Sequence, residues 1–215
     1  MKNYRIPLEE DRFYHIYNRG NNSEQLFFTN ANYEFFIRQY DNFLSDYVDT
    51  FAFCLLPNHF HLLIRVKPIK DLKVSLEKNE TLLKVPHFEK AKPLRSVSAQ
   101  FQKLFTSYSM AINKQEGRHG SLFEKPFRRI EVSSTQYLAN LVFYIHANPQ
   151  LHGLCDDFRH YPWSSYDRIL KTKPSKLCKK EVIEWFDDKE NYLAYHSQKA
   201  DIAAIKAKHK GFTFF

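Results

Sequence analysis

The sequence predicts an α+β fold of the ferredoxin-like type: a split βαββαβ antiparallel sheet with helices on one face, followed by a C-terminal helical extension. Segments rich in β-branched and aromatic residues alternate with segments whose apolar residues recur at helical spacing, in the order β, α, β, β, α, β, α. The chain has 215 residues, of which 43% are hydrophobic and 16% aromatic, so it can bury a substantial core.

The chain begins with an expected strand and helix. Residues 12–18 (RFYHIYN) are rich in Tyr, Phe and Ile and lead into RGNN, which is typical of a strand entering a turn. Over residues 29–49 apolar side chains such as Phe36, Tyr40 and Leu44 recur at helical spacing, behind a suitable cap at Thr29. This spacing predicts a long helix.

A hairpin is expected next. Residues 50–56 (TFAFCLL) and 59–66 (HFHLLIRV) are β-prone, and the Pro57-Asn58 dipeptide between them favours a tight connection. Residues 67–95 are polar with weak periodicity, which we interpret as a basic connecting segment that could close over a ligand.

The third part of the predicted fold is a helix, a strand and a second helix. Apolar residues at helical spacing predict a helix over 96–114, and 121–132 is strand-like. The Ser133-Ser134-Thr135 cluster is a strong helix cap, and the helix that follows is expected to end before Pro149. We expect a main domain over 1–160 and small helices in an extension over 161–215.

Composition narrows the class of partner and the compartment. Lys and Arg total 32 against 24 Asp and Glu, a net charge of +8 with a pI near 9.2, which makes nucleic acid about as good an explanation as a merely basic surface. Three widely separated cysteines are typical of reduced thiols, and no apolar run approaches the ~18 residues of a membrane span. A cytoplasmic protein is expected, neither secreted nor in a membrane.

Two patterns could carry chemistry. Strand alternation points His59 and His61 to one face of the sheet and Phe60 to the other, so both imidazoles could reach one cation. Tyr144 and Asn148 are one helical turn apart on one face of the last helix. Each pattern alone has a commoner explanation, namely two histidines on a solvated strand and an aromatic residue of the core.

Together these motifs resemble a known family, the HUH single-tyrosine transposases of the REP-associated (IS200-like) branch. The resemblance rests on LLPNHFHLLIRV, GRHGSLFEKPFRRIEV and YLANLVFYIHANPQLHGL followed by YPWSSY, and it spans roughly residues 14–166. It implies that His59, His61 and Asn148 hold a divalent metal, Mg²⁺ or Mn²⁺, and that Tyr144 is the nucleophile. Tyr137, on the same side of the helix, is the second choice.

The resemblance also implies a substrate, single-stranded or hairpin DNA in a bacterial cytoplasm, which would be cut and rejoined through a 5′-phosphotyrosine. Basic residues interleaved with Phe123 and Phe127 suit phosphate contacts and base stacking, although a solvated face over a buried Phe ladder explains them equally well. The candidate DNA-binding residues are Arg19, Arg118, Lys125, Arg128 and Arg129.

Alternatives stay open at this point. A domesticated DNA-binding protein would keep the fold without cutting, and a metal-dependent hydrolase would use the histidines to activate water while Tyr144 is structural. The chain could be a monomer or a homodimer, and an exposed sheet edge at 59–66 could join two sheets.

Overall fold

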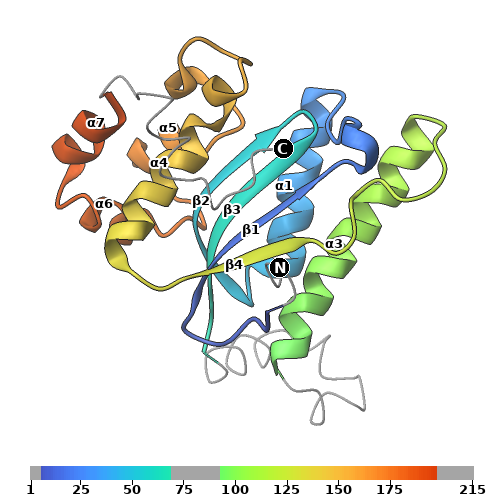
Figure 1. The fold of residues 1–215 in the computed structure, drawn as a ribbon, viewed down its shortest axis with the longest axis horizontal. Helices are drawn as coiled ribbons and strands as arrows, with labels where there is room; N and C mark the ends of the chain where they lie inside the picture. Colours follow the sequence, from blue (N-terminus) through green and yellow to red (C-terminus); the bar gives the residue numbers. More distant parts are fainter. Residues whose placement is uncertain (1–5, 69–92, 198–215) are drawn as a thin grey trace.

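The computed structural model describes residues 6–68 and 93–197. In these residues four strands form one antiparallel sheet in the order β2-β3-β1-β4, which confirms the predicted α+β class (Figure 1). The strands are β1 (Phe13–Arg19), β2 (Val48–Leu56), β3 (His59–Val66) and β4 (Arg128–Val132).

Helices cover both faces of this sheet. Figure 1 shows α1 and α3 on one side, and α4 with the C-terminal helices on the other. The helices are α1 (Asn30–Leu44), α3 (Pro93–Gln115), α4 (Thr135–Leu151), α5 (Tyr166–Leu170), α6 (Lys179–Glu184) and α7 (Lys189–Ser197), with 3-10 helices η1 (Asn21–Ser23) and η4 (Phe158–His160). No helix in the described ranges has the length and apolar character needed to cross a membrane.

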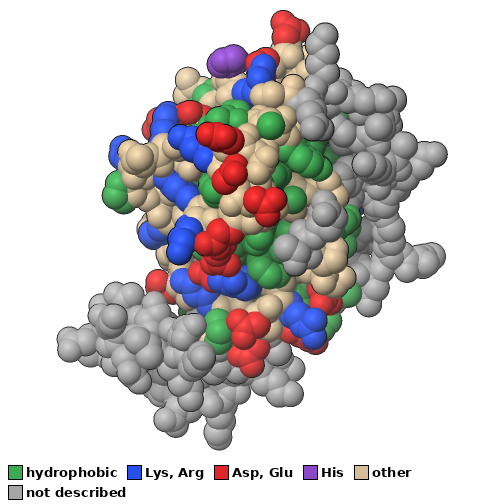
Figure 2. All heavy atoms as spheres, turned by 90° about the vertical axis from the view of Figure 1, so that its left-hand side faces the viewer, with side chains coloured by type: hydrophobic (Ala, Val, Ile, Leu, Met, Phe, Trp, Pro, Cys, Tyr) green, Lys and Arg blue, Asp and Glu red, His purple; other side chains and the backbone are tan. Residues whose placement is uncertain are grey.

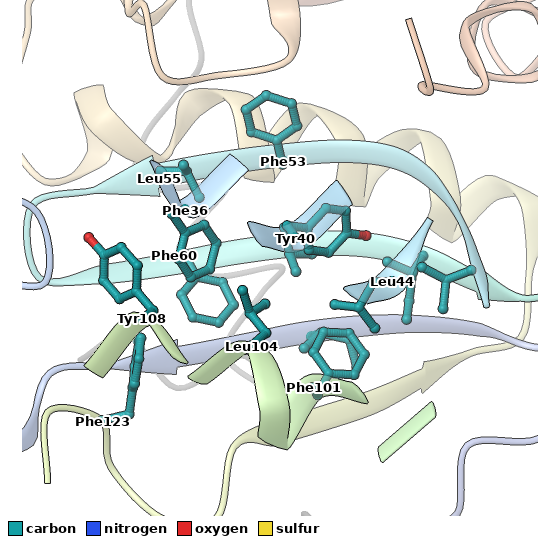
Figure 3. Close-up of a cluster of buried hydrophobic side chains, with 14 of the residues drawn as sticks. Phe36, Tyr40, Leu44, Phe53, Leu55, Phe60, Phe101, Leu104, Tyr108 and Phe123 are labelled. Atoms are coloured by element: carbon teal, nitrogen blue, oxygen red, sulfur yellow. The ribbon is translucent and has the colours of Figure 1, made fainter. Parts of the chain in front are cut away.

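The face under α1 and α3 holds an aromatic core (Figure 3). Since side chains alternate along β3, Phe60, Leu62 and Ile64 all point into this layer, as the sequence predicts. Phe60 packs against Phe36 of α1, with ring centroids 5.3 Å apart. The layer therefore fixes the orientation of β3, and with it the side to which the intervening histidines point.

The opposite face is covered by α4 and by the C-terminal extension. Val142 of α4 shares one buried cluster with Phe51 of β2 and with Val182 and Tyr192 of the extension. The division into 1–160 and 161–215 stays a prediction, but residues from both sides of that boundary build the same core.

Several element boundaries differ from the expected ones. Helix α1 ends at Leu44, because Val48 and Asp49 already pair with Val66 and Arg65 in the sheet. Strand β4 begins only at Arg128. The connection expected over 67–95 and the C-terminal tail lie largely outside the described residues.

Helix α4 also runs past the proline that was expected to end it. Pro149 lies inside the helix, which continues to Leu151. Pro149 has no N–H to donate to the Ile145 carbonyl, yet the turn that follows is hydrogen-bonded: His152 N–H donates to the Asn148 carbonyl at 3.1 Å and Leu154 N–H donates to the Pro149 carbonyl at 2.8 Å. Asn148 is thereby held in helical geometry.

The expectation of a free sheet edge at 59–66 is wrong. Strand β3 lies inside the sheet, between β2 and β1, and both of its sides are hydrogen-bonded. The edges of the described sheet are β2 and β4. The β-prone pattern of 59–66 shows that the segment is a strand, but not which strands pair with it. Whether the protein is a monomer or a dimer stays open.

Candidate active site

The sheet supplies two imidazoles to the layer between β3 and α4. His59 and His61 point to the α4 side and are 5% and 3% exposed, with ring centroids 5.2 Å apart. The alternation inferred from the sequence is thus present, and the two rings can approach one ligand.

Helix α4 brings the other two predicted residues to the same place. Its N-terminus is capped by Ser134, whose hydroxyl accepts the Tyr137 N–H, as the serine cluster predicts. The Asn148 amide nitrogen donates to the Tyr144 carbonyl at 3.4 Å, which turns the amide oxygen toward His59 Nε2, also at 3.4 Å. Asn148 is fully buried.

The hydrogen bonds around His59 indicate that these atoms suit a cation. His59 has an amide oxygen at each ring nitrogen, Asn58 at 2.7 Å from Nδ1 and Asn148 at 3.4 Å from Nε2; since the shorter contact places the proton on Nδ1, Nε2 carries a lone pair toward the Asn148 oxygen, another acceptor. Two acceptors that face each other are stabilised by a positive ion between them. No group of three His, Cys, Asp or Glu side chains in the described ranges could hold a metal, so the amide would be the third protein ligand.

A histidine that sequence reasoning missed supports His61. His15 of β1 is 1% exposed, and its Nε2 lies 2.9 Å from His61 Nδ1. This contact engages one nitrogen of His61 and leaves Nε2 as the atom available for a ligand. The signal was readable: residues 13, 15, 17 and 19 alternate along β1, and the predicted split βαββαβ topology places β1 beside β3.

His152 is a second residue that the sequence interpretation missed. Its ring lies 4.8 Å from that of His59, centroid to centroid, and its side chain is exposed at the rim of the site. It follows Asn148 by one helical turn, just as Asn148 follows Tyr144. That repeated spacing was readable, but the helix was expected to stop at Asn148.

The surroundings keep the imidazoles neutral. Burial lowers the pKa of His59 to about 3, and the proximity of His152 lowers it further. Burial and the neighbouring His15 hold the pKa of His61 well below its usual value. Only neutral imidazole can ligate a metal, so both side chains are in the state that ligation requires.

Tyr144 lies against these rings. Its ring is edge-on to His61 and His15, at centroid distances of 5.7 and 6.2 Å. Burial raises the pKa of Tyr144 to about 12, although a hydrogen bond with Asn148 opposes the rise. The residue is only 2% exposed, so a phosphate can reach the hydroxyl only after part of its cover has moved.

Tyr137 lies two turns earlier on α4 and is half-buried. Burial and the proximity of Tyr144 raise the pKa of Tyr137 to about 12. It remains the second choice for the nucleophile.

The five candidate DNA-binding residues do not share one environment. Arg19 and Arg128 both pair with Glu124, at 3.6 and 3.2 Å, and Arg118 pairs with Glu24. Within the described residues, the side chains of Lys125 and Arg129 have no carboxylate within 4.0 Å.

Fold and site together define a class: α+β proteins in which a His-Phe-His strand faces a helix that carries a tyrosine and an amide one turn apart. Comparison with known proteins finds similar sequences and folds among tyrosine transposases. A curated protein of Haemophilus influenzae, described as a REP-associated tyrosine transposase, is 27% identical over 128 residues, which cover 58% of this chain and 62% of that protein. The chain thus spans less than two thirds of the length of this relative.

A solved structure of a REP-associated tyrosine transposase bound to a REP hairpin has the same fold. It matches with a TM-score of 0.57 and 16% identity, over 79% of this chain and 86% of that one. No family model matches the sequence. In sequence and in fold the chain is therefore similar to REP-associated tyrosine transposases, which confirms the resemblance inferred from its motifs.

Proposed function

We propose that this protein is a transposase that cuts and rejoins single-stranded or hairpin DNA in the bacterial cytoplasm, with Tyr144 as nucleophile. The proposal rests mainly on one observation: the Asn148 amide oxygen lies 3.4 Å from His59 Nε2, and the Tyr144 ring lies against His61 with ring centroids 5.7 Å apart. The nucleophile and the candidate ligands thus meet at one point. The name of the Haemophilus relative and the hairpin bound to the structural neighbour support a DNA substrate.

His59, His61 and Asn148 would hold a divalent cation. When bound, the cation would neutralise charge on a phosphate and orient it for attack. Two imidazole nitrogens and one amide oxygen suit Mn²⁺ better than Mg²⁺, which prefers oxygen ligands.

The remaining chemistry belongs to Tyr144. Its hydroxyl oxygen would form a bond to phosphorus while the bond from phosphorus to the 3′ oxygen breaks, and the departing 3′ oxygen would take up a proton. The product is a 5′-phosphotyrosine and a free 3′ hydroxyl, which can attack in reverse and rejoin strands. Since the pKa of Tyr144 is raised to about 12, the hydroxyl enters this step as a neutral phenol and must lose its proton during attack.

Basic residues on both faces of the sheet would bind the DNA backbone. Arg19 and Arg128 lie on the histidine side of the sheet, since Arg19 pairs with His59 across the strands and Arg128 pairs with Tyr17. With Arg118, Lys125 and Arg129 they form the proposed set of phosphate contacts.

The test is covalent capture of DNA. The protein is incubated with Mn²⁺ and a pool of end-labelled DNA hairpins with randomised single-stranded flanks, then denatured and separated by size. A labelled band that moves with the protein is expected, lost in Tyr144→Phe and retained in the matched variant Tyr137→Phe.

The alternatives give different results in the same assay. Free cleaved DNA that persists in Tyr144→Phe would support a hydrolase, and bound but intact DNA would support a binding protein. An adduct lost in Tyr137→Phe instead would move the nucleophile to that residue.

A further inference from the structure

A groove on the other face of the sheet lies outside the site described above. It has a volume of about 750 Å³ and lies between α3 and the segment 120–129. Clefts that bind small ligands typically have ~300–1,000 Å³. The groove is therefore large enough for a ligand.

The lining combines aromatic and polar side chains. Phe105, Phe123 and Phe127 pack against one another, with Phe105 4.9 Å from Phe123 and 5.5 Å from Phe127 between ring centroids. Gln102 and Thr106, one turn apart on α3, line the same groove and are exposed. Apolar ring surface thus lies beside groups that can donate and accept hydrogen bonds.

The groove also collects the uncompensated charge of the basic segment. Of the five candidate DNA-binding residues, only Lys125 and Arg129 have no carboxylate within 4.0 Å in the described ranges, and both line this groove. The face that carries α6 and α7, by contrast, mixes side chains of both signs (Figure 2). Glu124 also lines the groove, but its carboxylate pairs with Arg19 and Arg128, so the charge left over is positive and an anion is favoured.

Arg129 is the strongest indication of an anion. Its guanidinium donates to Ser98 at 2.9 Å and lies over the ring of Phe127, 4.5 Å from the centroid. Its Nε is buried without a hydrogen-bond partner among the described residues, and burial lowers the pKa of the side chain. A phosphate beside the guanidinium would supply the missing opposite charge.

The course of β4 connects the groove to the candidate active site. β4 is an edge strand, paired with β1 alone among the described strands. Its side chains alternate, so Arg128 lies on the histidine face beside Tyr17 while Arg129 lines the groove. A single DNA strand that crosses this edge could contact both arginines.

We propose that the groove binds a short unpaired stretch of the DNA substrate, with a backbone phosphate at Arg129 and bases against Phe105 and Phe127. This inference rests on the proposed function, because it assumes a DNA substrate. Stacking on aromatic side chains beside cationic groups is the usual way to bind single strands without regard to sequence. The groove would hold the unpaired flank while the phosphate to be cut lies at Tyr144.

The test measures binding of a fluorescent oligothymidine 12-mer to the full chain by anisotropy, at several salt concentrations. Arg129→Gln removes the cation, and Thr106→Trp fills the groove from an exposed position. Lys103→Gln is the matched control, since Lys103 is exposed on the same helix but does not line the groove. The same variants are tested for binding to a blunt hairpin and for the covalent adduct.

Arg129→Gln should lower the slope of log affinity against log salt by about 0.7, the value for one phosphate contact of a single strand. Thr106→Trp should weaken oligothymidine binding at least about fivefold, the lower range for the loss of base stacking. Lys103→Gln should change neither quantity, and binding of the blunt hairpin should change least.

Unchanged oligothymidine binding in both groove variants would overturn the inference. So would an equal loss for the blunt hairpin, which would assign the groove to duplex DNA. If wild-type protein forms no Tyr144 adduct but binds single strands through the groove, the proposed transferase function fails while the groove assignment stands. If the adduct forms and the groove variants bind normally, only the groove assignment fails.

Discussion

A buried chain of hydrogen bonds ties α4 to the C-terminal extension. His196 Nδ1–H donates to the Tyr192 carbonyl at 2.7 Å, so its Nε2 must accept from His146 Nδ1–H, at 3.0 Å. His146 Nε2 then accepts the Ser165 hydroxyl at 2.7 Å, and Ser165 itself accepts the Phe53 N–H of β2 at 2.9 Å. The donor and the acceptor of each of these hydrogen bonds are thereby determined, and His146 lies in the middle of the chain.

Replacing His146 with leucine should therefore be costly. The substitution roughly keeps the volume but leaves the Ser165 proton and His196 Nε2 without partners in a site where His146, Ser165 and His196 are at most 1% exposed. A buried polar group without a partner costs about 1–3 kcal/mol, so two of them predict a loss of about 2–6 kcal/mol in the free energy of unfolding. Since single domains have only about 5–15 kcal/mol, the loss should be large but measurable.

Urea denaturation followed by circular dichroism measures this loss, with an unchanged m-value as the sign that the denatured state is the same. His160→Leu is the control, because the side chain of His160 is 84% exposed and its replacement should change the stability by less than about 0.5 kcal/mol. His196→Phe and the double variant complete a cycle. A coupling of about 1 kcal/mol or more is expected between residues in direct contact.

Two results would refute the reasoning. One is a loss below about 1 kcal/mol in His146→Leu, which would mean that the partners find other bonds or water. The other is strict additivity in the cycle, which would mean that His146 and His196 stabilise the fold independently.

Three further predictions follow from single side chains. Burial lowers the pKa of His196 to about 4, so as the pH falls the unfolded chain takes up a proton near pH 6.5, before the folded chain does. The free energy of unfolding should therefore fall by up to about 3 kcal/mol between about pH 6.5 and about pH 4, measured by urea denaturation, and should fall less in His196→Phe. Asn58→Ala frees the His59 ring and should weaken Mn²⁺ binding about 10–100-fold by calorimetry, with the circular dichroism spectrum unchanged. Arg65→Met should cost about 1 kcal/mol in thermal denaturation, because it removes partly exposed ion pairs with Asp49 and with α6.

The sequence predicted those parts of the site that depend on local geometry. Alternation along one strand places His59 and His61 together, and the helical period places Asn148 one turn from Tyr144. Both relations hold whatever the rest of the fold does. That the two pairs meet was inferred only from the family resemblance, because it depends on α4 packing across the sheet.

Contacts between distant segments were not predicted, although the predicted split βαββαβ topology already places β1 beside β3. The contact of His15 with His61 exists because β1 lies next to β3, and the same strand order makes 59–66 an inner strand rather than an edge. The ion pair of Arg118 with Glu24 also joins segments that are far apart in the sequence. A list of basic residues therefore could not separate neutralised arginines from those with charge to spare.

The buried state of Tyr144 sets a condition on how the site can open. Asn148 and Tyr144 face the histidines, whereas His146, between them in sequence, faces the opposite way and holds α4 to Ser165 and His196. Moving the whole helix away from the sheet would break that chain, at the cost worked out above. Rotation of the Tyr144 side chain, or displacement of the exposed His152 at the rim, leaves the hydrogen bonds of His146 with Ser165 and His196 intact. The hydroxyl should therefore become accessible by a local movement that leaves α4 and its metal-ligand candidate Asn148 in place.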